Sequence, residues 1–111
     1  MFRVPGGNIG VLQVFPSKII VLTPDGERHV YRKIQLFWGE KAVFEPGNRV
    51  PSVVDALGAR LGMMICFDWI FPETCRSLAL AGARVILHPS NLVMPWCQQA
   101  MTTRTLENSV F

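Results

Sequence analysis

The chain has 111 residues, enough for one small domain, and 50% of them are hydrophobic while only 17% are charged. Because so small a domain normally carries more charge, we expect further chain or a partner subunit to cover part of its apolar surface. The 11 basic and 8 acidic residues give a net charge of +3 and are scattered along the sequence, which argues against a nucleic-acid surface.

The first half of the chain is predicted to form β-hairpins. Residues 11–23 are rich in β-branched residues and are interrupted only at 15–17, so they are interpreted as two strands. The turn-forming residues PDGE at 24–27 then lead into a third strand, from Arg28 to about Lys33. Residues 34–51 contain glycine and proline among aromatic residues, and they are expected to form a long ordered loop of the kind that often carries function.

The second half is predicted to alternate strands with helices. The predicted elements are strands at 52–57 and 60–66, a helix from 72 to 82, a strand at 84–88 and a helix at about 95–108. Gly58 joins the two strands, and the run LGMMIC in the second is apolar enough for burial on both faces. Pro72 and Glu73 open the helix, because proline loses no needed hydrogen bond there and the acid meets the positive end of the dipole. This order predicts an α/β layer with a mixed sheet, and the triplet at 109–111 is expected to begin another strand.

The location and cofactors of the protein are also constrained by the sequence. No uninterrupted apolar run is long enough to span a membrane, and the first ten residues lack the plan of a signal peptide. We therefore expect a cytoplasmic protein without a membrane partner. Three cysteines without a CxxC spacing predict neither a disulfide framework nor a zinc site. A metal or organic cofactor is not expected.

Cys66 stands where strand becomes helix, in the stretch ICFDWIFPE at 65–73. A thiolate at this place would be stabilised by amide donors and by the helix dipole, as at a nucleophile elbow, although the Gly-x-Ser-x-Gly pattern is absent. On burial statistics alone a cysteine after an apolar strand is a core residue, and Cys75 and Cys97 are interpreted in that way. His88 ends a strand and is as consistent with a structural role as with a functional one. Because neither histidine makes a convincing pair with Cys66, a carboxylate is the favoured base.

Lys33 and Glu40 give the sequence a second polar pair. Taken singly, Lys33 is interpreted as a lysine whose ammonium reaches solvent and Glu40 as an ordinary loop acid. Acyl transfer by a cysteine would need a cation or an amide pair for the oxyanion, but only the resemblance described next groups Lys33 and Glu40 with Cys66 in one site.

The segments YRKIQLFWGEKAVFEPG at 31–47 and ICFDWIFPE at 65–73 resemble, in this order, the carbon-nitrogen hydrolase or nitrilase superfamily. The similarity runs from the TPDGE turn through GARLGMMICFDW and LALAGARVILHPSN to RTLENSVF. The resemblance implies that residues 1–111 are the central part of a single domain, truncated at both ends. The fold it implies is α/β, a partial αββα sandwich with a mixed sheet and helices on one face.

The resemblance also implies a role for each site residue. Cys66 is similar to the nucleophile that forms a thioester acyl-enzyme, and Lys33 to the lysine that stabilises the tetrahedral intermediate together with the backbone N–H of Phe67. Glu40 is similar to a second glutamate that positions lysine and substrate. The predicted substrate-binding residues are Phe67, Asp68, Trp69 and Asn91. Arg104 and Glu107 match a helix end of the family and are interpreted as a structural pair, because residues three apart lie on one helix face.

Three departures from the family pattern bear on the prediction. The upstream glutamate that acts as general base in the family has no counterpart here, because Asp25 and Glu27 belong to the hairpin turn. Gln35 also replaces the usual histidine, and the C-terminal strands are absent. We therefore expect the 111 residues to belong to a longer enzyme and to be inactive alone.

The activity implied by the resemblance is hydrolysis of a non-peptide C–N bond in a small amide or N-carbamoyl compound, through a cysteine thioester. One alternative is nitrile hydrolysis, although nitrile-hydrolysing members often carry Cys-Trp-Glu where this chain has Cys66, Phe67 and Asp68. Another is a non-catalytic chain that binds a partner through its sheet. For the full-length protein we expect a small-molecule amide substrate and, as is common in the family, a homo-oligomer.

Overall fold

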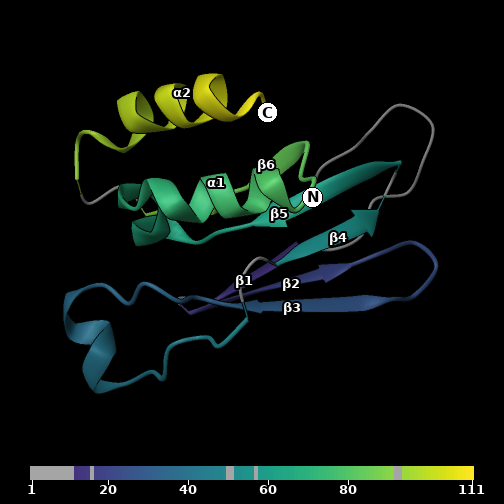
Figure 1. Ribbon diagram of the computed structural model, residues 1–111. Helices are drawn as coiled ribbons and strands as arrows, with labels where there is room; N and C mark the ends of the chain where they lie inside the picture. Colours follow the sequence, from purple (N-terminus) through teal and green to yellow (C-terminus); the bar gives the residue numbers. More distant parts are fainter. Residues whose placement is uncertain (1–11, 16, 50–51, 57, 92–93) are drawn as a thin grey trace.

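The structure, a computed structural model, describes residues 12–15, 17–49, 52–56, 58–91 and 94–111 and consists of three layers (Figure 1). The first sheet is antiparallel and contains β1 (Leu12–Phe15), β2 (Lys18–Leu22) and β3 (Arg28–Arg32). The second contains β4 (Val53–Ala56), β5 (Ala59–Met63) and β6 (Val85–Leu87). Helices α1 (Pro72–Leu80) and α2 (Cys97–Asn108) cover the outer face of the second sheet. The predicted fold class is confirmed.

Only the second sheet is mixed. Strand β5 pairs with β4 in antiparallel fashion and with β6 in parallel fashion, and α1 forms the crossover between the two parallel strands. Phe111 extends this sheet, because its N–H donates to the carbonyl of Arg84 at 2.9 Å and its carbonyl accepts from the N–H of Ile86 at 2.6 Å. These bonds follow the pattern of a parallel ladder, so the residue occupies the place predicted for a further strand.

The two sheets pack face to face through alternating side chains. Ile19 pairs with Tyr31 across the β2–β3 hairpin, and both are buried against Met63 at the end of β5 and Ile65 just after it. Met64, which lies between these two, points the other way, into the core that the helices share with that sheet. Because side chains alternate along extended chain, one apolar run supplies both cores.

Helix α1 packs very closely on β5. A Cβ atom at Gly62 would lie 3.2 Å from Leu78 Cβ of this helix, 3.0 Å from Ala83 Cβ after it and 2.9 Å from Ile86 Cδ1 of β6, so only glycine fits without displacement. Pro72 stands at the first turn as predicted, and Cys75 and Leu78 form the buried face of the helix. The interpretation of Cys75 and Cys97 as core cysteines is confirmed, since their exposed fractions are 0% and 3%.

Two differences from the sequence prediction bear on the site. Strand β5 ends at Met63 rather than at residue 66, because Cys66 turns into a 3₁₀ helix, η2 (Cys66–Ile70). The loop at 34–51 contains a second 3₁₀ helix, η1 (Trp38–Ala42), where irregular structure was predicted. The predicted start of the first strand at residue 11 and the strand end at residue 57 lie outside the described residues. In the ranges that the structure describes, no helix has the length and apolar character needed to cross a bilayer.

Candidate active site

Cys66 lies at a sharp turn that lifts it out of the line of β5. Its φ angle is 40°, in the left-handed region that residues with a side chain adopt only at a cost of about 1–3 kcal/mol. The turn is closed by Asp68, whose Oδ2 accepts a hydrogen bond of 2.8 Å from the N–H of Ile65. We call residues 65–71 the cysteine turn. A strained residue at a strand-to-helix junction is the arrangement of a nucleophile elbow.

A second turn of the same design carries Glu40. Trp38 also has a φ angle of 40°, and the N–H of Phe37 donates to Glu40 Oε2 at 2.7 Å, just as Ile65 donates to Asp68. We call residues 37–43 the glutamate turn. The two turns touch, because the rings of Phe37 and Phe67 lie 4.9 Å apart between centroids.

Lys33 is fully enclosed and makes an ion pair with Glu40. Its exposed fraction is 0%, and its Nζ donates to Glu40 Oε2 at 2.6 Å, while the Glu40 side chain remains 24% exposed. The N–H of Lys33 donates to the carbonyl of Ser17 at 2.8 Å, which extends the β2–β3 pairing and sets Lys33 on the same face as Tyr31. The alternative in which Lys33 reaches solvent does not agree with this burial. A buried, paired lysine beside a strained cysteine turn is typical of a functional site.

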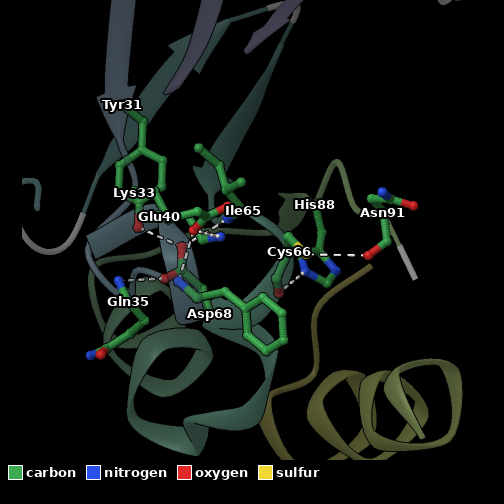
Figure 2. Close-up of polar contacts among 10 residues, drawn as sticks. Tyr31, Lys33, Gln35, Glu40, Ile65, Cys66, Asp68, His88 and Asn91 are labelled. Atoms are coloured by element: carbon green, nitrogen blue, oxygen red, sulfur yellow. Dashed lines mark hydrogen bonds and ion pairs between the residues drawn. The ribbon is translucent and has the colours of Figure 1, made fainter. Parts of the chain in front are cut away.

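The segment after β6 holds the backbone of Cys66 (Figure 2). The N–H of Cys66 donates to the carbonyl of Pro89 at 2.9 Å, and His88 Nε2 lies 2.9 Å from the carbonyl of Cys66, to which it donates. His88 therefore contacts the backbone of Cys66 and not its thiol. Burial lowers the pKa of His88, which favours the neutral ring.

The thiol of Cys66 has a weak polar neighbour in this segment. Its Sγ donates to the backbone carbonyl of Asn91 at 3.4 Å, so Asn91 faces Cys66 with its main chain. Among the described residues no carboxylate is hydrogen-bonded to this thiol, and Glu27 instead pairs with His29 at 3.1 Å in the first hairpin. The base predicted for Cys66 is therefore not found among its hydrogen-bond partners in the described residues.

The predicted substrate-binding residues lie in different environments. Asp68 is 0% exposed and Trp69 is 7% exposed in the core under the helices. Phe67 is half-buried between Phe37 and Phe71, and Asn91 is exposed. Substrate contact by these four residues stays a prediction, but the enclosure of Asp68 and Trp69 favours a supporting role for both.

Tyr31 is a site residue that the sequence reasoning missed. Its hydroxyl donates to Asp68 Oδ2 at 2.7 Å, from a position two residues before Lys33 on the same face. Burial, reinforced by the charge of Asp68, raises the pKa of Tyr31, so the hydroxyl keeps its proton and remains a donor. The signal was present in the alternation of β3, which places Tyr31 and Lys33 side by side on the inner face.

The structural pair predicted near the end of α2 is present. Arg104 Nη1 lies 3.3 Å from Glu107 Oε1, and the side-chain amide of Asn108 donates to the carbonyl of Arg104 at 2.8 Å. In the described part of the chain, no three side chains of His, Cys, Asp or Glu gather as metal ligands would.

Residues 11–111 match the carbon-nitrogen hydrolase family, and this match covers nearly the whole chain. The chain belongs to this family. This carbon-nitrogen hydrolase chain is 51% identical over 98 residues to a nitrilase of Pyrococcus abyssi, covering 88% of the chain and 37% of the relative. It is 35% identical over 100 residues to an (R)-stereoselective amidase of a Pseudomonas species, covering 87% and 36%. The chain thus spans little more than a third of the length of these relatives.

The carbon-nitrogen hydrolase chain is also similar to amidases of known structure. An amidase of Nesterenkonia sp. AN1, a member of the nitrilase superfamily, superposes with a TM-score of 0.76 at 32% identity, over 84% of this chain and 39% of that one. In that structure acrylamide has been added at the active-site cysteine. A cysteine-to-alanine variant of the same amidase, with a TM-score of 0.75, is in complex with butyramide.

The environments of the three cysteines in the carbon-nitrogen hydrolase chain predict different reactivities. Burial raises the pKa of both Cys75 and Cys97, so their thiolate fractions are small, whereas Cys66 is half-buried. We expect iodoacetamide to modify Cys66 at least about tenfold faster than the other two in the folded protein, as measured by mass spectrometry of cysteine-containing peptides. In guanidinium the three rates should converge. Equal rates in the folded protein would contradict the assignment of Cys66 as the accessible thiol.

Proposed function

We propose that this chain is the central part of a longer enzyme that hydrolyses a non-peptide C–N bond in a small amide or N-carbamoyl compound. The observation that carries the proposal is the ion pair between the enclosed Lys33 and Glu40, with 2.6 Å between Nζ and Oε2. Glu40 lies on a turn that touches the turn of Cys66. This arrangement supports the proposal, because acyl transfer requires a nucleophile and a cation for the oxyanion close to each other. The amidase relatives add support from the chemistry named for them.

In the proposed reaction a base outside these 111 residues takes the proton of Cys66, and the thiolate attacks the acyl carbon. The oxyanion of the tetrahedral intermediate is held by the Lys33 ammonium and by the backbone N–H of Phe67. The C–N bond then breaks, the nitrogen leaves as ammonia or an amine with a proton from the base, and water hydrolyses the thioester. Glu40 keeps Lys33 in place, and its carboxylate balances the positive charge of the ammonium.

Replacing Cys66 by alanine in the full-length enzyme tests this proposal. We expect turnover of a short aliphatic amide such as butyramide to fall by at least about 10⁴-fold, since loss of a nucleophile removes the covalent route. The thermal midpoint should change little, because Cys66 is only half-buried. Cys75→Ala, which truncates a core thiol instead, is the matched control and should retain most of the activity. Unchanged turnover in Cys66→Ala would overturn the proposal.

Hydrolysis of a nitrile is the second candidate, and the 51% identity to a nitrilase favours it. Both reactions begin with the same attack by Cys66, so the variants above do not separate them. A comparison of kcat/KM for butyronitrile and for butyramide does. The wild-type enzyme is an amidase if the amide is the better substrate and a nitrilase if the nitrile is. If the full-length protein turns over neither compound, a non-catalytic role is favoured.

A further inference from the structure

Asp68 belongs to the cysteine turn, yet its carboxylate also contacts the segment that carries Lys33 (Figure 2). Oδ2 accepts hydrogen bonds from the N–H of Ile65 at 2.8 Å and from the hydroxyl of Tyr31 at 2.7 Å. Oδ1 accepts from the N–H of Gln35 at 3.0 Å. The side chain is fully enclosed, so these bonds replace water for the carboxylate.

The donors of Asp68 lie next to the proposed catalytic residues. Tyr31 and Gln35 stand two positions before and two positions after Lys33, and Ile65 directly precedes Cys66. One carboxylate is therefore bonded on both sides of the lysine and at the base of the cysteine turn. No other side chain among the described hydrogen bonds joins these two segments.

The chemistry of the contacts agrees with a role in holding geometry. All three donors are neutral groups, and a buried carboxylate without a cation is costly compared with an apolar residue of similar size. The cost is explained if the bonds keep two segments in one arrangement. Glu40 serves the glutamate turn in the same way, since one oxygen accepts from both the N–H of Phe37 and Lys33 Nζ.

We propose that Asp68 is a positioning residue that fixes the placement of Lys33 relative to Cys66 and does not itself contact the substrate. The expected effect on catalysis rests on the proposed function, in which Lys33 must lie close to the oxyanion that forms when Cys66 attacks the substrate. A displacement of about 1 Å in such a site can cost on the order of 100-fold in rate.

Asp68→Asn in the full-length enzyme is the main variant. Asparagine keeps the size of the side chain but turns one acceptor into a donor, which then opposes an N–H or O–H group. Tyr31→Phe removes one donor with a smaller change and serves if Asp68→Asn fails to fold. Asp55→Asn is the matched control. Asp55 is an exposed acid that accepts hydrogen bonds of 2.9 Å from Arg60 and takes no part in the contacts of Asp68.

The connection that Asp68 makes between the two segments is tested by hydrogen exchange, which needs no turnover. In Asp68→Asn the amide that faces the new NH2 group loses its acceptor, and displacement of the side chain weakens the bond of the other, so we expect the amides of Gln35 and Ile65 to exchange at least about tenfold faster together, although they are far apart in sequence. In Asp55→Asn both rates should match those of the wild type. Unchanged exchange at both amides in Asp68→Asn would overturn the inference.

The positioning role is tested by separating kcat from KM with a short amide. We expect kcat to fall about 100-fold in Asp68→Asn and about tenfold in Tyr31→Phe, with KM within about threefold of the wild type. The double variant should be no slower than Asp68→Asn, because the two changes act through one hydrogen bond. A raised KM with unchanged kcat would place Asp68 in substrate binding and overturn the inference, and so would wild-type kinetics in folded variants. If the wild-type enzyme shows no turnover, the proposed function fails. The exchange result still decides whether Asp68 holds the two segments together.

Discussion

Replacing Lys33 by methionine in the full-length enzyme is expected to lower kcat for a short amide by about 1,000-fold while the protein stays folded. Loss of one oxyanion donor typically costs 10²–10³-fold, and here the donor is also a full charge. Methionine fills a similar volume in a site where the lysine is 0% exposed. Steady-state kinetics and circular dichroism measure the two effects.

Lys41→Met is the matched control for this result. Lys41 belongs to the same glutamate turn but is exposed, so its replacement should leave kcat within about twofold of the wild type. A Lys33→Met enzyme that keeps wild-type kcat would show that the oxyanion is stabilised by other groups. An equal loss in Lys41→Met would show that the effect belongs to the turn and not to the buried ammonium.

Replacing Glu40 by glutamine is expected to destabilise the protein by about 3 kcal/mol, more than Lys33→Met does. The reason is an asymmetry within the pair. Glutamine leaves a fully enclosed ammonium without a counter-charge, whereas methionine at position 33 leaves a carboxylate that is 24% exposed and still accepts from Phe37. Removal of one partner is costly chiefly through the charge that remains buried.

Urea unfolding of the two variants measures this asymmetry. Glu45→Gln is the control, because Glu45 is an exposed acid a few residues further along the same loop and should change stability by less than about 0.5 kcal/mol. Equal destabilisation by Glu40→Gln and Lys33→Met would contradict the argument. The Glu40→Gln enzyme should also lose activity, since Glu40 is the acceptor that holds Lys33 Nζ.

Local sequence patterns were sufficient for most of the fold. The β-branched run and the PDGE turn predicted the β2–β3 hairpin, and Pro72 with Glu73 predicted the start of α1, because these residues act on their own neighbours. The continuous apolar run LGMMIC predicted a strand buried on both faces, and Met63 and Met64 lie in the two different cores. The division of the strands into two sheets was implied only by the family resemblance, since pairing between distant strands depends on contacts that no local pattern encodes.

The turns of the site were harder to predict than the strands. Nothing in the apolar run LGMMIC indicates that Cys66 leaves the strand, because its positive φ depends on the bonds of Asp68 to groups as far away as Tyr31, 37 positions earlier. The pairing of Lys33 with Glu40 was suggested by the family resemblance, and the structure places the two in contact. The roles of these residues in catalysis stay predictions until the variants are measured.

The close seat of α1 on Gly62 bears on how such a site can acquire new substrates. The cysteine turn lies between β5 and α1, and α1 packs so closely on Gly62 that a Cβ atom there would meet Leu78 at 3.2 Å, so the shape of the turn has little room to vary. Diversity among relatives that share this core is then expected in the segments that border the cysteine turn without being locked by it. The loop around Trp38 is such a segment, since the side chain of Trp38 is 87% exposed.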